Sequence, residues 1–177
     1  MADKRLAGGP LGARLVKTTR RYFAAVRDGF NSGSAAKTTR WHLPRSLHDM
    51  KHFTFGPRRY AILVGGKVVG TCGLHYPQFS GLELVIAIFE KKVRGLGVGT
   101  FAVRAMCDVA FADLKIHRVE LGVYPDNAAG IAAYRKCGFK REATLRRYMY
   151  HEGRWRDVLW MSLLRKEWTG SKRRVSR

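Results

Sequence analysis

A glycine-rich stretch at residues 93–100 carries the clearest chemical signal in the sequence, VRGLGVGT. Its glycines, Gly95, Gly97 and Gly99, stand between an apolar run at 82–89 and an amphipathic run at 100–114, which predicts the order strand, turn, helix. Glycine lets a backbone approach a ligand closely, and a helix N-terminus presents unpaired N–H groups with a partial positive charge. The stretch therefore predicts an anion site for a phosphate; the competing interpretation is a connection that only packs a helix against a sheet.

Two common phosphate motifs do not fit this turn. A P-loop requires Lys followed by Ser or Thr after its last glycine, whereas Thr100 follows Gly99 directly. A dinucleotide fingerprint has the spacing G-x-G-x-x-G, whereas these glycines alternate as G-x-G-x-G. The pattern therefore argues against both kinds of nucleotide site.

The turn resembles R-x-x-G-x-G, the acyl-CoA pyrophosphate loop of GCN5-related N-acetyltransferases (GNAT), with Arg94, Gly97 and Gly99 at its fixed positions. Other residues follow in the order and spacing of that family: Asn127, Tyr134, Gly138 and Phe139. The motifs from residue 117 to the ending LLRKEW are similar to the RimJ/RimL-like branch, which acetylates ribosomal-protein N-termini and assorted small amines. The resemblance extends over roughly residues 12–168.

The resemblance implies that acetyl-CoA is the cofactor and gives several residues a role. Arg94 and the amides of the turn would anchor the pyrophosphate, while a strand edge would pair with the pantetheine arm and offer an N–H to the thioester oxygen. Asn127 would contact the arm. Tyr134 would protonate the leaving thiolate as general acid, since a phenol is neutral at pH 7; the alternative is a core aromatic. The implied cofactor-binding residues are Ile86, Ala87, Ile88, Phe89, Arg94, Gly95, Leu96, Gly97, Val98, Gly99, Thr100, Asn127 and Tyr134.

The general base is open between three possibilities. Glu83 is an acid in an otherwise apolar run, so it needs a partner or a chemical role, and it faces the acceptor side of the implied fold. His75 is the alternative, because a near-neutral imidazole suits proton transfer. In the third possibility the neutral amine is selected from solution without a dedicated base. The candidates for the acceptor wall, each of which could instead cover the core, are Trp41, His42, His48 and Tyr76.

These residues need a scaffold to position them. The resemblance implies an α/β (α+β) GNAT fold, with a mixed, mostly antiparallel sheet of about seven strands splayed at a central V and flanked by about four helices. Gly65-Gly66 predicts a hairpin, and Thr18 or Thr19 is expected to cap a helix that runs to about residue 30. Strands are expected at 13–17, 59–64, 67–74, 81–89, 118–124, 139–150 and 155–165, and further helices at 46–53, 97–114 and 127–136, the last one ended by Gly138.

Composition and chain length indicate the domain organisation and the compartment of the protein. The chain has 177 residues, 46% of them apolar, with no apolar run near the ~18 residues of a membrane span and no signal-peptide pattern at its start. We expect a flexible segment at 1–11, one GNAT domain at 12–168 and a basic tail at 169–177. The cysteines, Cys72, Cys107 and Cys137, lack metal-site spacing and predict buried thiols in a reducing, cytoplasmic setting.

The formal net charge of +21 favours polyanionic partners such as RNA or the ribosome, or else reflects solvated basic faces. The resemblance implies an enzyme, a monomer or homodimer, that moves an acetyl group from acetyl-CoA to a primary amine by direct attack in a ternary complex. The acceptor is expected to be a protein N-terminus or an amine in a ribosome or tRNA context. The alternative is a basic nucleic-acid-binding protein on a GNAT scaffold with weak or no catalysis.

Overall fold

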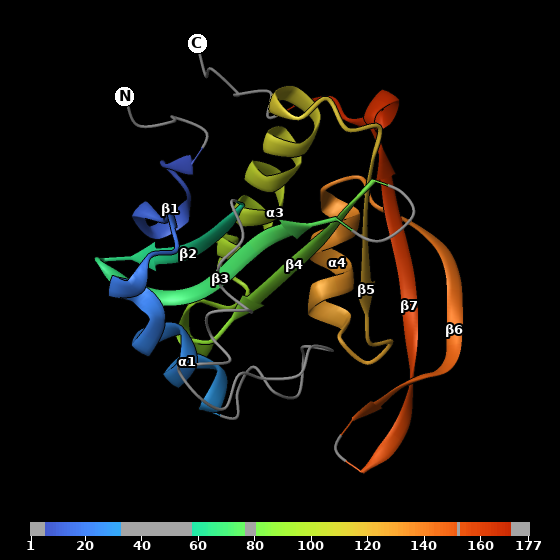
Figure 1. The fold of residues 1–177 in the computed structure, drawn as a ribbon, viewed down its shortest axis with the longest axis horizontal. Coiled ribbons are helices and arrows are strands. Elements are labelled where there is room, and N and C mark those ends of the chain that lie inside the picture. Colours follow the sequence, from blue (N-terminus) through green and yellow to red (C-terminus); the bar gives the residue numbers. More distant parts are fainter. Residues whose placement is uncertain (1–5, 33–57, 77–80, 152, 171–177) are drawn as a thin grey trace.

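A seven-stranded mixed sheet forms the centre of the protein in a computed structural model, which describes residues 6–32, 58–76, 81–151 and 153–170 (Figure 1). Neighbouring strands are antiparallel except for β4 and β5, which are parallel. Across the sheet the order is β1 (Arg14–Lys17), β2 (Arg59–Val64), β3 (Lys67–His75), β4 (Leu82–Ile88), β5 (Arg118–Val123), β7 (Arg154–Leu164) and β6 (Lys140–His151). The predicted mostly antiparallel sheet is confirmed.

The parallel pair β4 and β5 is splayed, as the resemblance implied. The two strands pair only at Leu82 with Val119 and at Glu83 with Glu120. Beyond these pairs the ribbons of β4 and β5 diverge (Figure 1). The V therefore opens at the carboxyl ends of both strands, which is where a parallel arrangement places ligands.

One edge of β4 faces this opening. On its other edge β4 remains paired with β3 up to Ile88, and the Phe89 N–H donates to the Val69 carbonyl at 2.8 Å. Backbone groups of an antiparallel pair alternate between the two edges of a strand. Since Phe89 bonds toward β3, the N–H and C=O groups of Ile86 and Ile88 are directed toward the gap.

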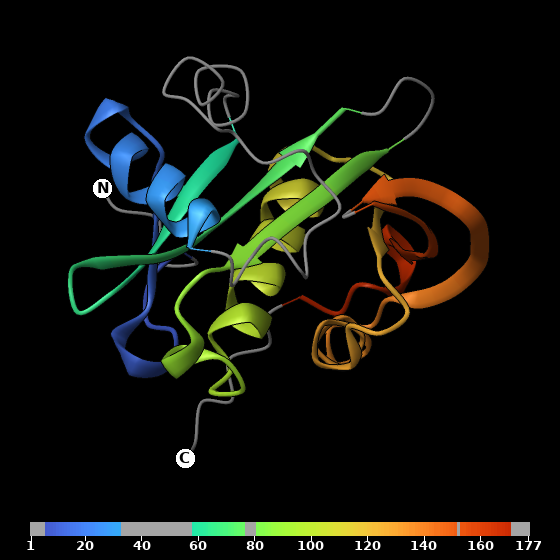
Figure 2. The same cartoon turned by 90° about the horizontal axis from the view of Figure 1, so that it is seen from below.

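Helices cover both faces of the sheet. They are α1 (Phe23–Asn31), α3 (Val98–Asp108) and α4 (Ala128–Lys136). α1 lies on one side of the sheet, and α3 and α4 lie on the other (Figure 2). Phe30 and Phe89 pack on the α1 side with ring centroids 4.7 Å apart, whereas Leu82 and Leu84 join the larger core on the opposite side. Side chains of β4 thus alternate between the two faces of the sheet. The predicted helix at 46–53 lies outside the described residues.

Two local predictions need correction. The first helix begins at Phe23 behind a 3₁₀ turn at Arg20–Tyr22, and Thr19 makes no capping bond because the Tyr22 N–H already bonds to the Thr19 carbonyl at 2.9 Å. The helix expected at 97–114 ends in a π-helical turn at Val109–Asp113. A 3₁₀ turn at Pro10–Gly12 begins within the segment expected to be flexible; its residues are exposed, and it lies near α3.

The hairpin and the thiols follow the predictions. Gly65 and Gly66 have φ values of 55° and 78°, the left-handed conformation that both central residues of a type I′ turn require. Cys72, Cys107 and Cys137 are free and buried. Among the described residues no helix is long and apolar enough to cross a membrane.

Candidate active site

The glycine-rich turn joins β4 to α3, as predicted. Gly95 and Gly97 have φ values of 77° and 84°, which L side chains rarely adopt. Gly97 is also the N-cap of α3 and offers no side chain to cap it. The first N–H groups of α3 therefore keep their bonding capacity for an anion.

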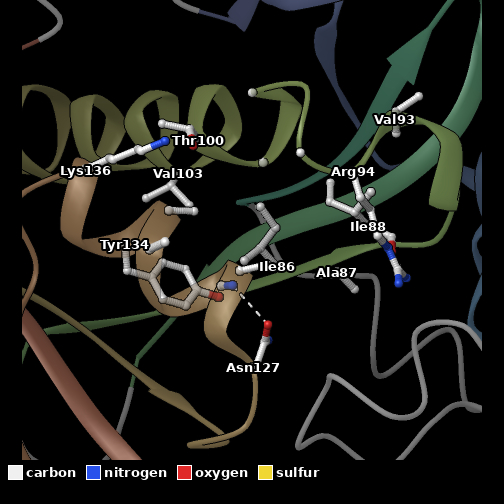
Figure 3. Close-up of a pocket in the computed structure, with 17 residues that line it drawn as sticks. Ile86, Ala87, Ile88, Val93, Arg94, Thr100, Val103, Asn127, Tyr134 and Lys136 are labelled. Atoms are coloured by element: carbon white, nitrogen blue, oxygen red, sulfur yellow. Dashed lines mark hydrogen bonds between the residues drawn. The ribbon is translucent and has the colours of Figure 1, made fainter.

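A cleft of about 400 Å³ lies between this turn, the end of β4, α3 and α4 (Figure 3). It brings together residues that are far apart in the sequence. Predicted cofactor residues that line it are Ile86, Ala87, Ile88, Arg94, Gly95, Gly97, Gly99, Thr100, Asn127 and Tyr134. The cleft therefore joins the glycine-rich turn to the end of β4 and to α4.

Three predicted cofactor residues place their side chains elsewhere. Phe89 is buried against Phe30 on the α1 side of the sheet. Val98 is fully buried in the core beneath α3, and Leu96 is exposed to solvent. Strand alternation explains Phe89, because its neighbour Ile88 takes the cleft side; only backbone groups of these three residues could serve a ligand here.

Arg94 is tied to the strand rather than to the turn. Its Nε and Nη2 donate to the Ile88 carbonyl at 3.1 and 2.6 Å. These two hydrogen bonds hold the first residue of the motif to the end of β4. The position of the turn relative to the strand is therefore fixed by the protein itself.

α4 has a sequence signal at each end, and these fix the two polar residues it carries into the cleft. Asn127 is its N-cap, and its Oδ1 accepts the Gly130 N–H at 2.9 Å. At the other end Gly138, with φ of 94°, donates to Arg135, and Phe139 donates to the Tyr134 carbonyl at 3.1 Å. These two bonds make a Schellman motif, which confirms Gly138 as the helix terminator.

Tyr134 lies two turns after Asn127 on the same helix. The residue is only 9% exposed, and its ring centroid is 6.0 Å from that of Phe139. The ring crosses the cleft with its hydroxyl toward the side of Ile86 and Asn127 (Figure 3). A phenol is thus held at the mouth of the V, opposite the edge of β4.

The two candidate bases are cross-strand neighbours on the other side of β4. His75 pairs with Glu83 in the register of β3 and β4, and Glu83 is 8% exposed. The Nη2 of buried Arg59 lies 2.8 Å from His75 Nδ1. Because arginine only donates, Nδ1 accepts, and the neutral imidazole carries its proton on Nε2. Taking up a proton at Nδ1 would break this bond, so the geometry favours Glu83 over His75.

The Arg59 guanidinium is itself affected by burial. Desolvation lowers its pKa to about 10, since the low-dielectric interior disfavours the charged form. The group remains charged at neutral pH and keeps its bond to His75. Of the predicted acceptor wall, Tyr76 is exposed beneath the Arg58 guanidinium, and Trp41, His42 and His48 lie outside the described residues.

Sequence reasoning missed seven residues that line the cleft: Val93, Val103, Ala129, Gly130, Ala132, Ala133 and Lys136. A usable signal was present in the run AAGIAA at 128–133, where small side chains leave room beside a helix. Lys136 lies at the end of α4 that is near Thr100 (Figure 3). It adds a cationic side chain to the lining of the cleft.

A contact outside the cleft holds the turn before α4. The Arg156 guanidinium of β7 stacks 3.7 Å from the ring centroid of Tyr124 and lies 2.5 Å from Asp126. Tyr124 is 1% exposed, so this contact is embedded in the fold. It links the outer strands to the segment that leads into Asn127.

Comparison with known proteins identifies the class. Residues 16–140 match the family model of the acetyltransferase (GNAT) domain. The chain therefore belongs to the GNAT acetyltransferase family, and the predicted membership is confirmed.

Individual relatives match this chain at about 30% sequence identity over roughly 60% of its length. The chain is 32% identical over 115 residues to "Uncharacterized N-acetyltransferase p20" of Bacillus licheniformis, covering 63% of this chain and 65% of that protein. It is 30% identical over 110 residues to the L-amino acid N-acetyltransferase AaaT of Escherichia coli, covering 60% and 68%. The match to p20 thus spans less than two thirds of that protein's length.

Solved structures share the fold over nearly the whole chain. RimJ of Mycobacterium smegmatis, in complex with CoA-disulfide, has a TM-score of 0.77 and 20% identity, covering 91% of this chain and 86% of that one. Spermidine N-acetyltransferase of Vibrio cholerae, in complex with CoA and spermine, has a TM-score of 0.76 and 21% identity, covering 88% and 96%. The predicted GNAT fold is confirmed.

Proposed function

We propose that this protein is an acetyl-CoA-dependent N-acetyltransferase that acetylates a primary amine by direct attack in a ternary complex. The observation that carries the proposal is the cleft itself. One cavity of about 400 Å³ contains the N-terminus of α3, which no side chain caps, the end of β4 at Ile86 and Ile88, and the buried phenol of Tyr134. Each feature matches a different part of a CoA thioester: the diphosphate, the pantetheine arm and the sulfur.

Residues of the cleft fit such a cofactor. The amides of the turn and of the first turn of α3 would hold the diphosphate, with Arg94 holding the turn in place. The edge of β4 at Ile86 and Ile88 would pair with the amides of the arm. Lys136, at the far end of α4, would hold a further phosphate of the cofactor.

Acetyl-CoA would supply an activated acetyl group as a thioester. An N–H of Ile86 or Ile88 would donate to the carbonyl oxygen, where negative charge develops as the amine nitrogen bonds to the carbonyl carbon. Glu83 would take the proton that the attacking amine loses, through a water molecule, because it lies on the opposite face of β4 from the cleft. Tyr134 would give its phenolic proton to the sulfur as the carbon–sulfur bond breaks.

The test is acetyl-CoA consumption over a panel of peptides, amino sugars and aminoacyl-tRNA. We expect Tyr134→Phe to lower turnover by about 10²- to 10⁴-fold, the usual range for losing a general acid, while CoA affinity is kept. Glu83→Gln is the matched change for the base and should remove the rise of turnover with pH. An unaltered turnover in Tyr134→Phe would exclude the phenol as the acid.

For the acceptor, we infer an amine on an anionic carrier, such as an N-terminus or aminoacyl group in a ribosome or tRNA context. The chain has 34 Lys and Arg residues against 13 Asp and Glu residues, which disfavours polycationic acceptors such as spermidine. Free buried thiols support a reducing, cytoplasmic setting. Salt-insensitive turnover on a small free amine, without RNA binding, would contradict this acceptor class.

A further inference from the structure

The ribbon formed by β6 and β7 carries a surface that the proposed acetyl transfer does not use. β6 is an edge strand of the sheet, and the turn end of the ribbon extends past α4 and β5 (Figure 1). Three aromatic residues on it are about half exposed: Tyr148 (48%), Tyr150 (57%) and Trp155 (53%). Tyr150 and Trp155 are cross-strand partners, so these two large exposed rings lie on the same face of the ribbon, and exposed apolar surface of this kind indicates an interaction site.

The rings are arranged in edge-to-face pairs. Tyr150 and Trp155 are cross-strand partners with centroids 5.5 Å apart and planes at 67°. Tyr148 meets Trp160 at 6.4 Å and 69°. An edge-to-face pair leaves a flat face of at least one ring uncovered, and such a face can stack on a planar group.

The same ribbon is strongly basic. Its basic residues are Lys140, Arg141, Arg146, Arg147, Arg154 and Arg156, against the three carboxylates of Glu142, Glu152 and Asp157, of which Glu152 lies outside the described residues. The two described carboxylates are engaged, Glu142 by Arg118 and Ser162, and Asp157 by the Arg147 backbone N–H at 2.8 Å. Within the described part of the chain, no ion pair involves the exposed side chains of Arg146, Arg147 or Arg154.

The rings and the basic side chains together restrict the kind of partner that this surface fits. One explanation for charge on an edge strand is that it prevents the strand from pairing with another chain. Exposed aromatic rings on the same strand do not fit this explanation, because they favour association. A second copy of the chain would bring like charges together. Exposed π-faces, on the same ribbon as guanidinium groups that form no ion pair with any described residue, instead match a polyanion with planar bases, which single-stranded nucleic acid provides. RNA is the polynucleotide whose loops present unstacked bases.

We propose that the end of the β6–β7 ribbon binds single-stranded RNA. The rings of Tyr148, Tyr150 and Trp155 stack on bases, and the side chains of Arg146, Arg147 and Arg154 pair with phosphates. The binding needs no acetyl transfer, so it is measured without acetyl-CoA, and its failure is separable from failure of the proposed function.

The experiment is a fluorescence-anisotropy titration of the full chain with a labelled 12-nucleotide RNA over a range of salt concentrations. Removing both paired rings, as Tyr150→Ala with Trp155→Ala, should weaken binding by about 5- to 100-fold for each base that loses its stacking partner. Removing two arginines, as Arg146→Ala with Arg154→Ala, should reduce the slope of log affinity against log salt by about 1.4. Thermal melts check that each variant folds.

The matched control removes the same charge from exposed positions off the ribbon, Arg20→Ala with Lys67→Ala. Three outcomes would overturn the proposal: equal loss of RNA affinity in ring variant and control; unchanged RNA affinity in the ring variant; or heparin and RNA duplex bound as tightly as the single strand. Loss of binding to anionic vesicles, or of a dimer in sedimentation, with RNA binding intact would assign the rings to a membrane surface or a second copy instead.

Discussion

Adding one methyl group at Gly99 should raise the stability of the protein and lower its affinity for acetyl-CoA. Gly99 is the second residue of α3 and has ordinary helical φ, and a Cβ there would meet only Ile88 Cγ1 at 3.8 Å, an ordinary van der Waals contact. Replacing glycine by alanine within a helix stabilises by about 0.5–1 kcal/mol. For a domain of this size that corresponds to a rise in Tm of about 1–4 °C.

The same methyl would occupy cleft space beside the helix N-terminus, because both Gly99 and Ile88 line the cleft. A diphosphate held away from one charge-assisted N–H bond loses about 1.5–3 kcal/mol, which weakens binding by about 10- to 100-fold. Calorimetric titration with CoA and thermal melts measure the two effects separately. A higher Tm with unchanged CoA affinity in Gly99→Ala would refute the turn as the diphosphate site.

Gly66→Ala is the matched control for this experiment. Gly66 has φ of 78° in the β2–β3 hairpin, and a Cβ there would meet open space. Forcing alanine into the left-handed region should cost about 1–2 kcal/mol, lowering Tm without touching the cleft. Gly99→Ala should therefore raise Tm and lower CoA affinity, whereas Gly66→Ala should lower Tm and leave CoA affinity unchanged. A general loss of folding would not produce this pair of results.

Two other substitutions test separate parts of the molecule. Lys136→Ala should weaken binding of CoA about tenfold, measured by calorimetry, and Arg135→Ala at the exposed neighbouring position should have a smaller effect. If Lys136 holds the 3′-phosphate, Lys136→Ala should leave binding of 3′-dephospho-CoA unchanged. Glu142→Gln should lower stability by less than about 1 kcal/mol at pH 7, because hydrogen bonds from Arg118 and Ser162 lower the pKa of a carboxylate that is 40% exposed. A lowered folded-state pKa stabilises above the ordinary value of 4.5 and stops stabilising as pH falls through the folded pKa, so melts of both proteins should converge in strong acid.

The strand and helix pattern was predictable because local chemistry set it. Gly65-Gly66 permits only a hairpin turn, and the alternating side chains of residues 82–89 fit a strand buried on both faces. Asn127 and Gly138 mark the two ends of α4 by capping chemistry that needs no tertiary contact. The first helix was predicted, but its start was placed too early, because a 3₁₀ turn at Arg20–Tyr22 precedes it and satisfies the groups that Thr19 was expected to cap.

The cleft was predictable only where its residues belong to local motifs. The bond from Arg94 to the Ile88 carbonyl depends on how the turn folds back on its strand, which no spacing in the sequence specifies. The contact of Arg59 with His75 likewise joins residues on different strands and decides which nitrogen of the imidazole accepts. Residues such as Lys136 enter the cleft because α4 packs beside α3, and that packing is a tertiary property.

The two ends of α4 explain why structure and proposed chemistry are hard to separate here. The Asn127 side chain caps the helix and also lines the cleft, while the Tyr134 carbonyl accepts the Phe139 bond that terminates it. Changing Asn127 would therefore alter helix stability and cofactor contacts together, by about 1 kcal/mol for the cap alone. Tyr134→Phe keeps the backbone bond and the ring contact with Phe139 and removes only the hydroxyl. A loss of turnover in Tyr134→Phe can therefore be read as chemistry rather than as folding.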